Sequence, residues 1–165
     1  MFVEFETLPE NARVWMYQAD RNLSEAEQAR VMDFLTTAVD TWVTHGMPMR
    51  GSVRLLFNRL VLLAADTGFQ EPSGCSIDSS TRWLQELGQA MNLSFFDRSI
   101  GYFEDGEWKF FSVFEAGKQV SGGIIRPDTR VMNPRVDSVG KLESLLVIPA
   151  SASFLNRYFS TVESR

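Results

Sequence analysis

The chain has 165 residues, of which 44% are hydrophobic and 12% aromatic, enough apolar material for a stable core and far from the composition of a disordered chain. Its formal net charge of −5 at pH 7 argues against a broad binding surface for nucleic acid or for an anionic membrane. One cysteine cannot form an internal disulfide, and no apolar run reaches the roughly 20 residues of a membrane span. We therefore expect a cytoplasmic protein that binds neither nucleic acid nor membrane.

Residues typical of strands fill Arg13–Gln18 and predict the first strand. A helix is expected next, because Ser24 and Glu27 form a capping-box pattern and apolar residues then recur at helical spacing. Gly46 suits the left-handed position that follows a helix, so we expect this helix to end near His45-Gly46.

Two apolar runs, residues 53–56 and 60–65, flank the polar pair Asn58-Arg59 and predict a hairpin. The second run is apolar throughout, which indicates a strand that is buried on both faces and therefore central in its sheet.

A second helix is expected from about Ser76 to a stop at Asn92. Its apolar residues recur at helical spacing and define one apolar face, which carries Ile77, Leu84, Leu87 and Met91.

Two further strands are expected, a fourth at 95–96 and 100–103 and a fifth at 108–111. The turn signal Glu104-Asp105-Gly106 joins them. The resulting order of elements predicts an α+β fold, a ferredoxin-like βαββαβ sandwich with one extra strand.

We expect a single domain, with residues 1–112 as the ferredoxin-like unit and residues 113–165 as a C-terminal extension packed on it. No internal repeat or linker-like composition divides the chain. The extension carries a short helical segment before Ser121 and an amphipathic segment near Phe154 to Phe159.

In that topology the end of the first helix, the end of the third strand and the start of the second helix share one sheet edge. His45, Asp66 and Cys75 would then emerge together, and His45 could act as a base toward the Cys75 thiol while Asp66 or Asp78 orients the imidazole. The competing interpretation is structural, because a lone cysteine is most often a small buried apolar residue.

The start of the second helix is also a candidate anion site, because its free N–H groups and nearby hydroxyls could hold a phosphate or carboxylate. The alternative is that these residues are caps and turn formers. The candidate positions are Ser73, Gly74, Ser76, Ser79 and Ser80.

Several chemistries are excluded by inspection. Neither Gly117-Lys118 nor Gly140-Lys141 has the earlier glycine and following hydroxyl of a nucleotide-binding P-loop. With one His and one Cys, a zinc site is not expected, and the sequence points to no other metal or cofactor.

Five segments carry a resemblance: residues 5–15, Trp42 with His45-Gly46, residues 73–80, residues 96–98 and residues 127–129. Together they resemble a family of bacterial proteins of about this length with no established function. Some members carry the label of an ABC-transporter ATPase, which the absence of the phosphate-binding loop contradicts.

We therefore expect a non-catalytic module that binds a protein or small-molecule ligand, and a homodimer through a sheet edge or apolar face is one form this could take. The alternative is a thiol-dependent transferase or hydrolase that uses Cys75, His45 and a carboxylate of Asp66 or Asp78.

Overall fold

The computed structural model describes residues 1–68 and 74–163 and shows a mixture of helices and antiparallel strands, which confirms the α+β class. The chain forms two compact units, one from Met1–Asp97 and Asp137–Gly140 and the other from Arg98–Val136 and Lys141–Arg165. Each unit has its own hydrophobic core. In the described ranges, no helix combines the length and the apolar character that a membrane span requires.

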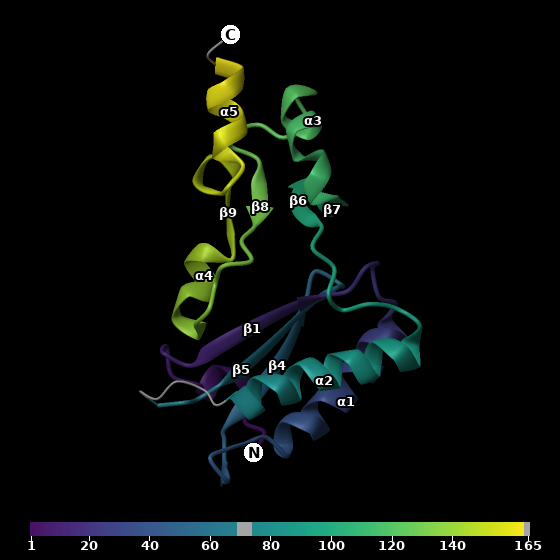
Figure 1. Ribbon diagram of the computed structural model, residues 1–165, viewed down its shortest axis with the longest axis vertical. Helices are drawn as coiled ribbons and strands as arrows, with labels where there is room; N and C mark the ends of the chain where they lie inside the picture. The colour runs from purple at the N-terminus through teal and green to yellow at the C-terminus, as the bar shows by residue number, and fades with distance from the viewer. Residues whose placement is uncertain (69–73, 164–165) are drawn as a thin grey trace. The chain divides into compact units, whose positions relative to one another are not determined.

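The first unit is built on a three-stranded antiparallel sheet in the order β1-β5-β4, as Figure 1 shows. The strands are β1 (Arg13–Gln18), β4 (Gly51–Leu56) and β5 (Leu60–Ala65). All six residues of β5 are buried, so the prediction of a central strand is confirmed. The tight turn before β5 has positive φ at both Phe57 and Asn58, the geometry of a type I′ turn.

Helices α1 (Glu25–Asp40) and α2 (Gly74–Met91) lie side by side on one face of this sheet (Figure 1). The predicted capping box is present, since the Ser24 hydroxyl accepts from the Glu27 N–H and the Glu27 carboxylate accepts from the Ser24 N–H. The predicted stop of α2 is also present, because Asn92 takes a φ of +55°. Buried apolar residues of both helices pack on the sheet, among them Val31, Leu35, Val39, Leu84 and Leu87.

The expected end of the first helix at His45-Gly46 is wrong, because α1 ends at Asp40. Strands β2 (Val43–Thr44) and β3 (Met47–Pro48) follow and form a two-stranded hairpin. His45 and Gly46 are its turn residues, with φ of +50° and +76°. The glycine provides positive φ as expected, but for a hairpin turn instead of a helix end.

The complete ferredoxin-like sheet is not formed. In that topology the strand after α2 would pair along β1, yet here a single bridge joins Gln18 to Phe96 and it is parallel. Of the expected fourth strand, residues 100–103 lie in β6 (Ile100–Glu104), whereas 95–96 belong to no strand. The fifth exists as β7 (Glu107–Phe111), joined to β6 by the predicted turn, but both belong to a separate sheet in the second unit. The division expected after residue 112 therefore differs from the one observed at Asp97.

The second unit contains a four-stranded antiparallel sheet in the order β7-β6-β8-β9, in which β8 is Arg130–Met132 and β9 is Val147–Pro149. Helices α3 (Ala116–Ser121) and α5 (Asn156–Glu163) contribute to its core, and α4 (Leu142–Leu145) precedes β9. Four short 3-10 helices complete the described elements of both units: η1 (Phe5–Thr7), η2 (Val113–Glu115), η3 (Val139–Lys141) and η4 (Ala150–Ala152).

Candidate functional site

The residues proposed for thiol chemistry occupy separate local settings in the first unit. Cys75 is the second residue of α2 and is exposed, as is Asp78 on the same helix. His45 is exposed in the β2–β3 turn, and Asp66 follows β5 with its carboxylate 3.8 Å from the Arg50 guanidinium. Among residues 1–68 and 74–163, no hydrogen bond or ion pair joins any two of the four predicted catalytic side chains.

Two of the hydroxyls proposed for anion binding make hydrogen bonds within the protein. The buried Ser80 hydroxyl lies 2.8 Å from the Tyr17 hydroxyl and donates to the Ile77 carbonyl at 2.7 Å. The Ser79 hydroxyl donates to the carbonyl of Cys75, four residues earlier in α2, at 2.9 Å. These bonds give both serines a structural role that needs no ligand.

The structure shows less about the other residues proposed for anion binding. Gly74 is exposed as the first residue of α2. Ser73 lies outside the described residues, and so does the side chain of Ser76. The anion site therefore stays a prediction.

The outer edge of β4 is a feature that the sequence did not reveal. β4 pairs with β5 on one side, and on its other side the N-terminal segment pairs with it only at Gly51. There the Gly51 N–H donates to the Met1 carbonyl and the Val3 N–H donates to the Gly51 carbonyl, both at 2.9 Å. The chain then turns into η1 and leaves the rest of the β4 edge uncovered.

The register of β4 determines which backbone groups point outward. The Asp66 N–H donates to the Arg50 carbonyl at 2.8 Å, and hydrogen-bonded pairs alternate along an antiparallel ladder. Ser52 and Arg54 therefore direct their backbone groups toward β5, whereas Val53 and Leu55 direct theirs away from it. In the part of the chain that the structure describes, nothing bonds to these outward N–H and C=O groups of Val53 and Leu55.

A cleft of about 410 Å³ lies along this edge. Residues 52–55 of β4 form its floor, and Gln28, Ala29 and Met32 of α1 form one wall. The N-terminal segment also lines the cleft, through Phe2, which packs with the α1 core, and through residues 4–6. An open strand edge beside a helix is the arrangement that accepts an extended peptide as an added strand.

The α1 wall is tied to the hairpin that contains β4. The Gln28 side-chain amide donates to the Leu23 carbonyl at 2.9 Å and to the Asn58 side-chain oxygen at 3.2 Å. The Leu23 N–H also donates to the Asn58 carbonyl at 2.8 Å. Since Asn58 belongs to the β4–β5 turn, the two bonds to it hold the start of α1 beside one end of the cleft.

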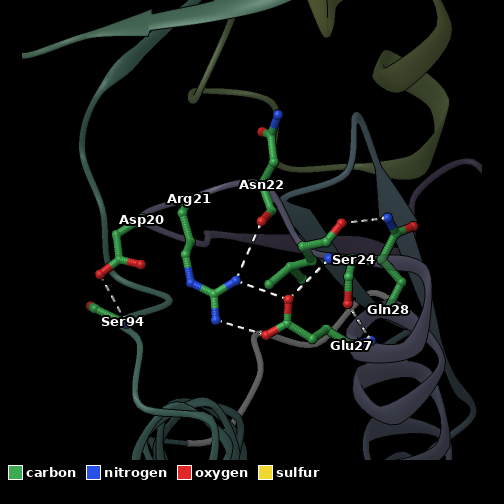
Figure 2. Close-up of polar contacts among 8 residues, drawn as sticks. Asp20, Arg21, Asn22, Ser24, Glu27, Gln28 and Ser94 are labelled. Atoms are coloured by element: carbon green, nitrogen blue, oxygen red, sulfur yellow. Dashed lines mark hydrogen bonds and ion pairs between the residues drawn. The ribbon is translucent and has the colours of Figure 1, made fainter.

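Figure 2 shows the charged cluster that fixes the first turn of α1. The Arg21 guanidinium donates two hydrogen bonds to the Glu27 carboxylate, at 2.9 and 2.7 Å, and the Ser24 N–H donates a third at 3.0 Å. Chiefly through the Arg21 side chain, and next through the Ser24 backbone, these donors lower the pKa of Glu27 to about 2. Glu27 is thus a structural carboxylate that orients the helix start.

Arg54 holds Phe5 and Glu6 of the N-terminal segment beside β4. Its guanidinium lies 4.0 Å from the centre of the Phe5 ring and 2.6 Å from a Glu6 carboxylate oxygen. Because Val53 and Leu55 pack in the core with α1, Arg54 must point to the other face of the sheet. Phe5 and Glu6 therefore lie on the face of β4 opposite α1, whereas Phe2 packs with the α1 core.

Comparison with protein-family models, with curated proteins and with solved structures found no match for this chain.

Proposed function

We propose that this protein is a non-catalytic binding module whose first unit takes up an extended segment of another protein as a strand added to β4. The observation that carries the proposal is the outward orientation of the Val53 and Leu55 backbone groups along a cleft with an apolar α1 wall. Strand addition uses such groups for affinity and the flanking walls for specificity.

The small number of outward backbone groups on β4 indicates a modest affinity for the bound segment. Val53 and Leu55 offer two N–H and two C=O groups, and each hydrogen bond contributes about 0.5–1.5 kcal/mol net. Four such bonds contribute about 2–6 kcal/mol, less than the roughly 8 kcal/mol of a micromolar complex. Apolar contact with Ala29, Met32 and Phe2 would have to supply the remainder.

The contrast with the other edge of the same sheet supports a role for β4. Sheet edges are normally protected, because unpaired backbone groups invite association. The outer edge of β1 is covered at both ends, where Val14 donates to the Asp137 carbonyl and Gln18 to the Phe95 carbonyl, both at 2.9 Å. β4 contains neither the proline nor the lysine that often protects an edge strand.

Two matched alanine substitutions on α1 test the proposal. Ala29 lines the cleft and Ala26 does not, and both are exposed. Linear peptides selected from a random displayed library against the full-length chain should bind the Ala29→Phe variant about tenfold more weakly, because the ring fills the cleft. Ala26→Phe should bind them like the unmodified protein. Equal binding to all three proteins would refute strand addition at this site.

The alternative function, a thiol-dependent transferase or hydrolase, is favoured by one observation, the exposure of Cys75 at the start of a helix. It requires His45 to act on that thiol. Iodoacetamide alkylation of Cys75 across a pH series, in the unmodified protein and in His45→Ala, separates the two proposals. The binding-module proposal predicts identical profiles, whereas the thiol enzyme predicts that His45→Ala moves the profile to higher pH.

A further inference from the structure

The charge around the β4 edge identifies a class of partner, on the premise of the proposed function. We infer that the segment bound on β4 is basic as well as apolar, with Lys or Arg residues alternating with aliphatic ones. The observation behind this inference is that apolar residues of α1 and carboxylates of the N-terminal segment line the same cleft along β4.

Side chains of an added strand alternate between the two faces of the sheet. On the α1 face they would meet Ala29 and Met32, which favour aliphatic side chains. On the other face they would meet Glu6 beside Arg54, and the carboxylate residue Glu4 lines the same cleft. The bound segment therefore meets both apolar side chains and negative charge in the cleft.

Glu4 and Glu6 differ in whether a positively charged side chain pairs with their carboxylate. Glu6 forms an ion pair with Arg54 at 2.6 Å. Glu4 is exposed, and no described residue forms an ion pair with its carboxylate. The charged groups that line the cleft thus leave one negative charge, positioned to attract a cationic side chain.

The charge of the whole first unit has the same sign. Its residues include 14 acidic and 7 basic side chains, whereas the second unit has 7 acidic and 9 basic ones. A second copy of the chain that paired through its own β4 would bring together two strongly acidic units, which repel each other. A basic segment is attracted instead.

Three matched peptides test the inference with the full-length protein. The probes are fluorescently labelled Ser-Lys-Val-Lys-Val-Lys-Ser and its versions with Gln or Glu in place of every Lys, followed by fluorescence anisotropy at low salt. We expect the Lys peptide to bind about tenfold more tightly than the Gln peptide and the Glu peptide to bind most weakly. The difference should shrink in about 0.5 M salt, because ions screen exposed charges.

Two glutamine variants test whether Glu4 is responsible for the tighter binding of the Lys peptide. Glu4→Gln should weaken the Lys peptide about three- to fivefold and leave the Gln peptide unchanged, the scale expected for one exposed ion pair. Glu10→Gln removes the same charge from the N-terminal segment outside the cleft and should change neither. If Glu4→Gln and Glu10→Gln weaken binding of the Lys peptide equally, the attraction is nonspecific and the inference is overturned.

The remaining outcomes separate the inference from the proposed function. If the Gln or Glu peptide binds as tightly as the Lys peptide and Ala29→Phe weakens it, the inference fails while strand addition stands. If none of the three peptides binds, the peptides selected from the library decide, and a set without Lys or Arg enrichment overturns the inference. A library that yields no binder refutes the proposed function. A dimer in sedimentation that Ala29→Phe dissociates makes a second copy the occupant and also overturns the inference.

Discussion

Replacing two buried serines by alanine is expected to have opposite effects on the stability of the fold. The Ser80 hydroxyl is hydrogen-bonded to Tyr17 in the core, whereas the Ser52 hydroxyl is buried with no partner among the described residues. Ser80→Ala should lower the free energy of unfolding by about 1–2 kcal/mol, because the Tyr17 hydroxyl loses its partner. Ser52→Ala should leave it unchanged or raise it slightly, because an unsatisfied hydroxyl is removed.

Urea unfolding measures both changes, and Tyr17→Phe provides the control. The double variant Tyr17→Phe with Ser80→Ala should cost less than the sum of the two single changes, since the pair acts together. Additive costs would show that the bond contributes nothing to stability.

The lowered pKa of Glu27 predicts a contribution to stability that depends on pH. Its pKa in the folded state is about 2, mainly because Arg21 donates to it, and an ordinary glutamate in the unfolded chain titrates near 4.3. A lowered folded-state pKa contributes stability that is present above about pH 4.3 and is lost as the pH falls toward 2. Arg21→Gln should raise the pKa of Glu27 in an NMR titration, whereas Arg30→Gln, which changes another exposed arginine nearby, should not. A Glu27 carboxylate that titrates identically in both variants would contradict the cluster in Figure 2.

At the scale of elements, the close packing of α1 on β4 depends on a glycine. A Cβ at Gly51 would lie 2.9 Å from a methyl carbon of Val39 and 3.1 Å from the Ala64 carbonyl oxygen. Gly51→Ala should therefore destabilise the first unit by about 1–3 kcal/mol, through overpacking. Gly74→Ala is the control, because a Cβ there meets no described atom within 4 Å. Equal thermal stability of the two variants would argue against this packing.

Elements with strong local signals were predicted from the sequence. Arg13–Gln18 has the composition of a strand, Ser24 and Glu27 cap a helix, and the turn at residues 104–106 joins two strands as expected. Very short elements were missed, because the two-residue strands β2 and β3 and the three-residue strands β8 and β9 are too short for periodicity to show. The helix end was misplaced because a glycine with positive φ serves a helix end and a hairpin turn equally well.

Partners in a sheet were harder to predict than strands. Residues 100–104 form a strand, as expected, but pairing with β7 and β8 decides their sheet, and such pairing joins residues far apart in the sequence. The assumption that they pair with β1 produced the ferredoxin-like prediction. The expectation that His45, Asp66 and Cys75 share one edge depended instead on the misplaced helix end, since His45 lies in a hairpin turn.

At the scale of the whole molecule, the candidate site depends on where the N-terminal segment leaves the edge of β4. The β4 edge is open because the N-terminal segment pairs at Gly51 and then turns away, and no local pattern in residues 51–56 announces this. The net charge of the whole chain, −5, does not reveal the charge around this edge, because it combines an acidic first unit with a slightly basic second unit. Composition of the whole chain argued against nucleic acid and membranes but could not indicate that one unit is strongly acidic.

The most direct test of strand addition is amide hydrogen exchange at β4, followed by NMR in the free protein and with a bound peptide. The register predicts fast exchange at Val53 and Leu55 and slow exchange at Ser52 and Arg54 in the free protein. A bound segment should slow Val53 and Leu55 by about tenfold or more at saturation, because their N–H groups then donate to it. Slow exchange at Val53 and Leu55 in the free protein, or no change when the peptide binds, would contradict the account.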